Sequence, residues 1–227
     1  MINSKLSHEA NLVLAEFLRL PDLGVKCPYF TNERQKVRGA LRVQVGKGSA
    51  EEIVEEALLI AHKSKVELAK LSPENKTKFL VDHNLGIDCS GFVYYILEAE
   101  GVGRGYGHLV DKLSFPKANN VLSIIRKLFV KRPVENMSVA VFADASNSRQ
   151  IKINEARAGD FFVINKYAKQ TGTPRNHIMV IIKIENGEIE IAQSVALPED
   201  GRYGHGVRIE QIDSSNPPGE LRRLNWF

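Results

Sequence analysis

The sequence predicts an α+β protein, with helices in the first half of the chain and an antiparallel sheet in the second. In the first half, apolar residues recur at the three-and-four spacing of helices, between residues that commonly cap helix ends. In the second half, apolar runs follow one another as strands do. Two of these runs are joined through Glu185-Asn186-Gly187, and Asn-Gly between apolar strands is the strongest short-range signal of a hairpin.

Three elements are predicted before the centre of the chain. Residues from about Ser7 to Leu20 have the apolar spacing of an amphipathic helix, and Leu41 to Val45 alternates like a short strand. Ser49-Ala50-Glu51-Glu52 has the pattern of a capping box, which predicts a long helix through about Leu71. Ser72-Pro73 then predicts a new helix, because serine is a good cap and proline is favoured at the first helical position.

The central predicted helix carries a cysteine in its first turn. Gly86 interrupts what precedes it, Asp88 is a good N-cap, and Gly101 stands where a helix commonly ends. Unpaired N–H groups and the helix dipole stabilise an anion at Cys89, so we expect a lowered thiol pKa and a nucleophile. From these residues alone, a buried structural cysteine is an equally good interpretation. The other cysteine, Cys27, is interpreted as packing.

After this helix the sequence changes character. Glycines at 103, 105 and 107 predict a turning loop, followed by a helix over 121–130 and a strand over 138–143. The glycines do not form a phosphate-binding loop, since no strand precedes them and no Lys-Ser/Thr pair follows. The remaining chain predicts four strands, at about 159–164, 177–184, 188–194 and 206–210.

Two polar residues of the predicted hairpin could complete a cysteine site. His177 begins a strongly apolar strand directly after a polar loop, so it can lie at a sheet edge and act as a general base. Counting outward from the turn places the neighbourhood of Gln193 opposite His177, where its carbonyl could orient the imidazole. Each also has a structural interpretation, as a hydrogen-bonded strand-end histidine and a solvent-facing strand glutamine.

Composition narrows the possible partners and location. The 227 residues have a formal net charge of +4, and the basic residues are scattered among acids, which does not favour a nucleic-acid partner. No apolar run approaches the length of a membrane span, and the first residues do not form a signal peptide. We therefore expect no membrane span and a cytoplasmic location, with secretion by another route left open. Two cysteines form neither a zinc pattern nor a disulfide framework.

Three segments together resemble a known family. Asp88-Cys89-Ser90-Gly91-Phe92-Val93, Glu155-Ala156-Arg157-Ala158-Gly159-Asp160-Phe161-Phe162 and His177-Ile178-Met179-Val180-Ile181 resemble the signatures of the NlpC/P60 superfamily, in the same order. Members of that superfamily are papain-like cysteine peptidases, which typically hydrolyse amide bonds in bacterial cell-wall peptides. The resemblance covers about residues 84–208, with an interruption from about 103 to 154.

The resemblance implies a fold, a domain organisation and residue roles. The expected fold is papain-like, with a helical N-terminal region over 1–75 and a catalytic domain over 76–227 that holds an insert at about 103–154. Cys89 would be the nucleophile, His177 the base and Gln193 the third, polar residue. Asp88 and Ser90 would line the pocket for the free amine of a short peptide or peptidoglycan fragment. The resemblance implies no metal and no organic cofactor.

Some features depart from the family and leave other functions open. The tyrosine that the family places shortly before the Asp-Cys pair is missing from 78–85, and Tyr29 or Tyr106 could replace it. The same fold could serve an acyl or amide transferase, a catalytically silent module that binds a peptide or protein, or an effector acting on a host protein. The long insert is predicted to lie over the active-site cleft, with decoration of the far side as the alternative.

Overall fold

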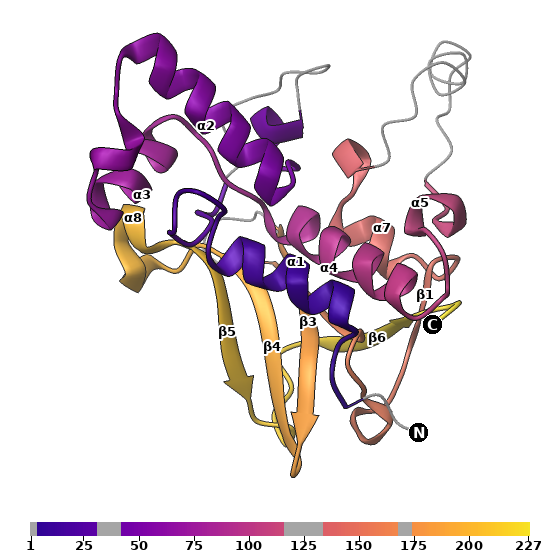
Figure 1. Ribbon diagram of the computed structural model, residues 1–227. Coiled ribbons are helices and arrows are strands. Elements are labelled where there is room, and N and C mark those ends of the chain that lie inside the picture. Colours follow the sequence, from indigo (N-terminus) through magenta and orange to yellow (C-terminus); the bar gives the residue numbers. More distant parts are fainter. Residues whose placement is uncertain (1–3, 31–41, 116–133, 168–173) are drawn as a thin grey trace.

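The computed structural model describes residues 4–30, 42–115, 134–167 and 174–227, and it has the predicted α+β architecture (Figure 1). Seven α-helices lie within the described residues: α1 His8–Leu18, α2 Ala50–Ser64, α3 Pro73–Asp82, α4 Cys89–Gly103, α5 Leu109–Lys112, α7 Val139–Ala143 and α8 Gly201–Gly204. The predicted caps are confirmed. The Ser49 hydroxyl and the Glu52 carboxylate form a reciprocal capping box on α2, and Ser72 caps α3 with Pro73 in its first turn.

Six strands form one antiparallel sheet in the order β1-β6-β2-β3-β4-β5. Their bounds are β1 Ser148–Gln150, β2 Phe161–Tyr167, β3 Pro174–Glu185, β4 Glu188–Val195, β5 Gly206–Ile212 and β6 Glu220–Leu224. The β3–β4 hairpin is the one predicted, and both of its turn residues, Asn186 and Gly187, have the positive φ that such turns require. The short strands β1 and β6 were not predicted from the sequence.

Three predictions of local structure were wrong. Residues Arg42–Val45 form a 3-10 helix and α7 replaces the strand predicted over 138–143, because short apolar runs do not by themselves separate strand from helix. The helix predicted to reach Leu71 ends at Ser64, where Lys65 takes a left-handed conformation, and only a 3-10 turn follows at Leu68–Lys70. The helix predicted over 121–130 lies outside the described residues.

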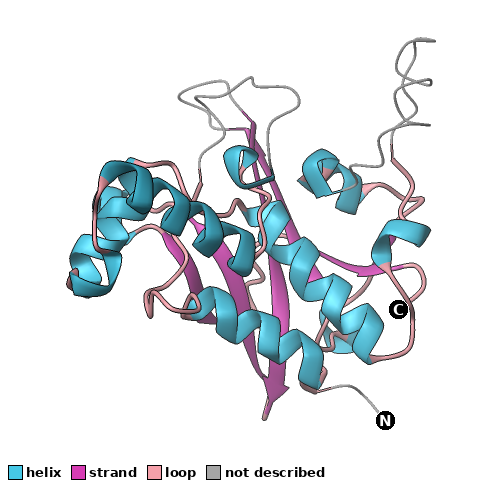
Figure 2. Ribbon diagram, turned by 45° about the horizontal axis from the view of Figure 1, so that its top comes forward, coloured by secondary structure: helices cyan, strands magenta, loops and turns pink. Residues whose placement is uncertain are grey.

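Helices α1 and α4 lie side by side across one face of strands β3, β4 and β5 (Figures 1 and 2). The rings of Phe17 and Phe92 pack edge to face, with their centroids 5.5 Å apart. The main apolar cluster joins both helices to Val180 and other inward residues of the sheet. A second cluster, which includes Met179 and Ile181, contains the residues that alternate with those and therefore belongs to the opposite side of the strands.

A buried carboxylate ties α1 to α4. Glu100 lies near the end of α4, and it is 2 % exposed. Its carboxylate accepts the Ser7 N–H at 2.6 Å and the Arg104 Nε–H at 2.8 Å. Arg104 also donates to the Lys5 carbonyl, so the first turn of α1 is held by the last turn of α4. Each carboxylate oxygen of Glu100 thus accepts a hydrogen bond, and this offsets the cost of burying the charge.

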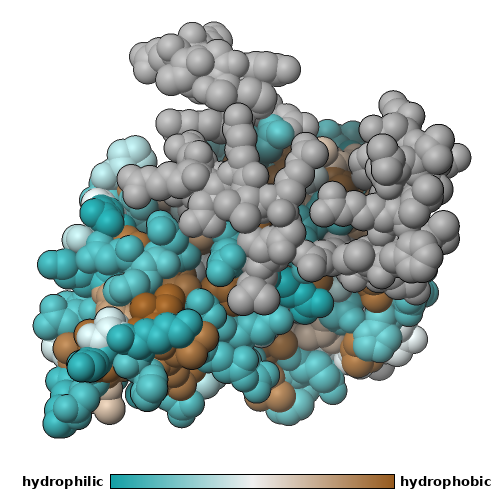
Figure 3. Space-filling model, turned by 90° about the horizontal axis from the view of Figure 1, so that it is seen from above, coloured by the Kyte–Doolittle hydropathy of each residue, from teal (hydrophilic) through white to brown (hydrophobic). Residues whose placement is uncertain are grey.

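The coloured part of the surface in Figure 3 is mostly hydrophilic, with apolar areas between the polar ones. Exposed large apolar side chains occur in several elements, including Leu58 and Leu59 of α2. Isolated exposures of this kind are normal for a folded domain. Among the described residues, none of the helices combines the length and the apolar composition that crossing a membrane requires.

We expect Glu100→Ala to destabilise the protein by about 2–4 kcal/mol, because it leaves the buried Ser7 N–H and the Arg104 guanidinium without their acceptor. Urea unfolding followed by circular dichroism measures the free energy of unfolding. The matched control is Glu16→Ala, on the exposed side of α1, which should change it by less than about 0.5 kcal/mol. Equal effects of the two substitutions would contradict this account of Glu100.

Candidate active site

The start of α4 presents Cys89 to the end of the sheet. Asp88 is the N-cap, and its Oδ1 accepts the Gly91 N–H at 2.7 Å, as predicted. Helix α4 packs on β3 and β4, and the Ser194 hydroxyl of β4 donates to the Ile87 carbonyl at 2.8 Å. Cys89 is 7 % exposed, whereas Cys27 is completely buried. Of the two thiols, Cys89 is therefore the one that a reagent can approach.

The resting Cys89 thiol is not the acidic group that its helix position suggested. Burial raises the pKa of Cys89 to about 11, and the neighbouring Asp88 carboxylate adds to the increase. The Lys47 ammonium and the backbone N–H of Ile178 act in the opposite direction, but they do not offset the burial. Cys89 is thus a neutral thiol near pH 7, and it needs a base before it can act as a nucleophile.

His177 and Gln193 meet as predicted. His177 Nε2 lies 2.6 Å from Gln193 Oε1, across the β3–β4 hairpin. Gln193 Nε2 donates to a carboxylate oxygen of Glu210 on β5, also at 2.6 Å. A carboxylate can only accept hydrogen bonds, so Glu210 must be bonded to the amide nitrogen of Gln193. The amide oxygen of Gln193 therefore points toward the imidazole. The imidazole then carries its proton on Nε2, and Nδ1 is left with a free lone pair.

Glu210 was not among the site residues predicted from the sequence. It stands on β5, two positions along from Arg208, which pairs with Gln193 in the sheet register. An acidic residue in a strand with alternating polar positions gives no sign of this role, and only the pairing of β4 with β5 brings it to Gln193. Burial lowers the pKa of His177, while the bond to Gln193 and the charge of Glu210 raise it in part.

The structure brings the thiol to the backbone of β3 beside His177. The Cys89 sulfur lies against the N–H of Ile178, whose side chain belongs to the same apolar cluster as Cys89. By strand alternation, His177 shares the other side of β3 with Met179 and Ile181. Among the described contacts, no hydrogen bond joins the Cys89 thiol to the imidazole. The thiol and the imidazole are thus not in contact in this structure, and they would have to meet past Ile178 for a proton to pass between them.

A lysine that the sequence analysis did not single out lies beside the cysteine. Lys47 Nζ donates to Asp88 Oδ1 and to Ser90 Oγ, each at 2.6 Å, and its side chain is only 4 % exposed. Gly91 follows in the first turn of α4. A Cβ there would lie 3.1 Å from Lys47 Cδ and 2.9 Å from the Gly46 carbonyl oxygen, so the missing side chain also makes room for the lysine.

The Gly-Asp pair that contributes to the resemblance has a structural partner. Asp160 is buried immediately before β2 and receives two hydrogen bonds from the Arg223 guanidinium, at 2.7 and 2.8 Å. This pair links β2 to β6.

Of the two tyrosines considered as substitutes, Tyr106 packs on the Phe227 ring, and Tyr29 forms a backbone bridge with Ile87.

The described ends of the insert contact both the core and the start of α4. The Met137 carbonyl lies 3.4 Å from Ser90 Oγ, and Glu135 pairs with Arg42. Met137 and Phe142 belong to the main apolar cluster, and the Asn147 side chain bonds both backbone groups of Ser114. The returning segment around Met137 therefore lies close to the candidate site, whereas the insert begins at the opposite end of α4, and its residues 116–133 lie outside the described part.

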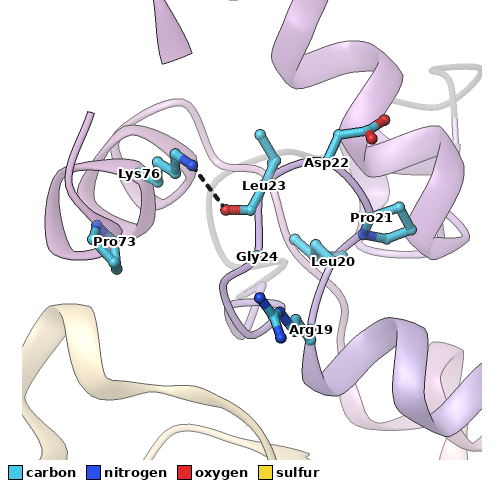
Figure 4. A pocket seen from close by; sticks show the side chains of 8 residues that line it. All are labelled: Arg19, Leu20, Pro21, Asp22, Leu23, Gly24, Pro73 and Lys76. Atoms are coloured by element: carbon cyan, nitrogen blue, oxygen red, sulfur yellow. Dashed lines mark hydrogen bonds between the residues drawn. The ribbon is translucent and has the colours of Figure 1, made fainter. Parts of the chain in front are cut away.

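The surface hollow in Figure 4 lies elsewhere, between the end of α1 and the start of α3. None of its lining residues belongs to the cysteine, histidine and glutamine site. Among the described residues, no cluster of three or more His, Cys, Asp and Glu side chains is arranged to hold a metal ion.

In comparisons with known proteins, no family model matches the chain, and no curated protein or solved structure matches it either.

Iodoacetamide should modify Cys89 in preference to Cys27, and its rate should rise about tenfold per pH unit between about pH 7 and 10, because only the thiolate reacts. Intact-mass measurement with peptide mapping follows both cysteines, and Cys89→Ser is the control. A rate that levels off below about pH 8 would mean that the thiol is acidic after all. Preferential modification of Cys27 would remove the basis for choosing Cys89.

Glu210→Gln should lower the pKa of His177 further, because a negative charge beside the Gln193–His177 pair stabilises the imidazolium and the amide does not. NMR titration of the imidazole resonances measures this pKa without a substrate. Glu188→Gln, at the turn end of the same hairpin, is the matched control and should leave the value unchanged. An unchanged His177 pKa in Glu210→Gln would exclude the proposed electrostatic link.

Proposed function

We propose that this protein is a papain-like cysteine amidase or peptidase of the NlpC/P60 kind, with Cys89 as nucleophile, His177 as base and Gln193 as the residue that orients the base. The observation that carries the proposal is the hydrogen bond of 2.6 Å between His177 and Gln193, next to the strand residue that contacts the Cys89 sulfur. The bond uses Nε2 and leaves Nδ1 available to accept the thiol proton.

In the proposed reaction, His177 Nδ1 takes the proton of Cys89 while the sulfur attacks the amide carbonyl carbon. The S–C bond forms, and the oxyanion is stabilised by the Cys89 N–H at the helix start, a donor typically worth about 2.7–4 kcal/mol. Collapse of the intermediate breaks the C–N bond, and the leaving amine takes the proton from His177. Water, deprotonated by the same imidazole, then attacks the thioester and releases the acid, and Cys89 regains its proton.

The raised pKa of Cys89 decides how the first step proceeds. A thiol with a pKa of about 11 does not transfer its proton to a buried imidazole before substrate binds. Proton transfer then accompanies S–C bond formation, as general-base catalysis. The missing thiol–imidazole bond in the resting state fits this order, since catalytic hydrogen bonds of free enzymes often tighten only in the substrate complex.

The proposed substrates are short peptides of the bacterial cell-wall type, by the resemblance of Asp88-Cys89-Ser90-Gly91 and the two later segments to that superfamily. An acyl or amide transferase would use the same thioester with an amine in place of water. A catalytically silent peptide-binding module is a second candidate. It is favoured by the neutral, buried thiol and by the lack of a described hydrogen bond between Cys89 and His177.

A mass-detected screen of γ-D-glutamyl and ordinary peptides should find hydrolysis that Cys89→Ala abolishes. His177→Ala should lower turnover by about 10²–10⁴-fold, and Gln193→Ala by less, because it disturbs the orientation of the base without removing it. His205→Ala is the matched control, since His205 bonds only the Leu197 carbonyl among the described contacts. Full activity in His177→Ala would overturn the assignment. Peptides that bind but stay intact, without any Cys89 adduct, would favour the silent module.

A further inference from the structure

The position between Asp88 and Ser90, on either side of the candidate nucleophile, is already occupied by an ammonium group. A lysine is almost never fully buried unless its charge is paired, and the Lys47 side chain is 4 % exposed. We propose that Lys47 is a specificity residue that fills the amine-binding position beside Cys89, so that the substrates are acyl groups with a blocked or uncharged amine at that position. This inference rests on the proposed amidase function, and it differs from the free amine that the resemblance implies.

The contacts of Lys47 leave little room for a second cation. Asp88 Oδ1 already accepts the Lys47 ammonium at 2.6 Å, the Gly91 N–H at 2.7 Å and the Ser90 hydroxyl at 3.1 Å. Ser90 Oγ also accepts from Lys47. A peptide ammonium at this position would find its acceptors in use and would face a like charge a few ångströms away.

The lysine is held there by its own backbone as well as by its ion pair. The Lys47 N–H donates to the Arg42 carbonyl at 2.8 Å, and the Lys47 carbonyl accepts the Tyr95 hydroxyl of α4 at 2.8 Å. The Asp88 N–H donates to the Gly46 carbonyl at 3.0 Å. Gly46 has a φ of +69° and no space for a side chain, since a Cβ would lie 2.5 Å from the Phe30 ring. The loop and the helix start therefore form one unit.

A neutral or acylated amine would need neither a free carboxylate acceptor nor a site without a neighbouring positive charge. It carries no charge to be repelled by Lys47, and its carbonyl oxygen could accept a hydrogen bond from the ammonium, which has three donors of which two are used by Asp88 and Ser90. The purely structural alternative is an ion pair that anchors the loop and takes no part in selecting the substrate. The two accounts differ in whether the amine of an incoming ligand affects its reaction with Cys89.

A matched pair of reagents tests this without requiring turnover. Alanine chloromethyl ketone and its N-acetyl form both alkylate a thiol: the S–C bond forms, the C–Cl bond breaks, and chloride and the thiol proton leave. Rates at Cys89 are measured by intact mass at about pH 6.5, where a free α-amine is mostly protonated, and are divided by the rates with N-acetylcysteine. The wild-type protein should prefer the acetylated reagent by about tenfold or more, the effect of losing one charge-assisted contact.

Lys47→Met keeps most of the apolar stem beside Gly91 and removes the charge, so it should lower that preference by about tenfold or reverse it. The matched control is Lys76→Met, because the Lys76 ammonium bonds the Leu23 carbonyl in the remote hollow of Figure 4. Its preference should equal that of the wild type. An unchanged ratio in a folded Lys47→Met protein would overturn the inference.

If Lys47→Met does not fold, the reagent preference of the wild-type protein still tests the inference about Lys47. A wild-type preference for the free amine would overturn the role of Lys47, whereas a preference for the acetylated reagent supports it. Failure of the proposed function looks different. In that case the selectivity of labelling persists, but no peptide, blocked or free, is hydrolysed by the wild-type protein.

Discussion

The candidate site depends on one carboxylate, that of Asp88. Its Oδ1 caps α4 through the Gly91 N–H and binds the Lys47 ammonium and the Ser90 hydroxyl. The cap fixes where the helix begins, and so where Cys89 stands relative to β3. The ion pair fixes the Gly46–Gly48 segment against the same turn. One group thus determines both the position of the candidate nucleophile and the charge around it.

A second set of contacts places the candidate base independently of the candidate nucleophile. His177, Gln193 and Glu210 come from three neighbouring strands and form a chain of hydrogen bonds across the sheet. This chain fixes the tautomer of His177 without contact to α4. The packing of α4 on the sheet then brings the Cys89 sulfur to Ile178. Misplacement of either unit would move the candidate nucleophile away from the candidate base.

Burial has opposite consequences for the two halves of the site. It raises the pKa of the Cys89 thiol and lowers that of His177, so both groups are neutral in the resting protein. Under the proposed function, this neutral pair becomes reactive when a substrate places a carbonyl beside the thiol. The buried Lys47–Asp88 pair has little net charge, so it changes this balance less than either charge alone would.

Local sequence determined the helix caps, the cysteine at the start of α4 and the Asn-Gly hairpin, because each depends on residues within one or two turns of chain. Counting residues outward from the hairpin turn also placed the neighbourhood of Gln193 opposite His177. Only the tertiary structure decided the positions of Lys47 and Glu210, which reach the site from a distant loop and from β5. It also decided the Cys89 pKa, since desolvation depends on how completely other segments cover the sulfur. Short-range patterns contain no information about such long-range contacts, and this is why the helix was predicted and its electrostatics were not.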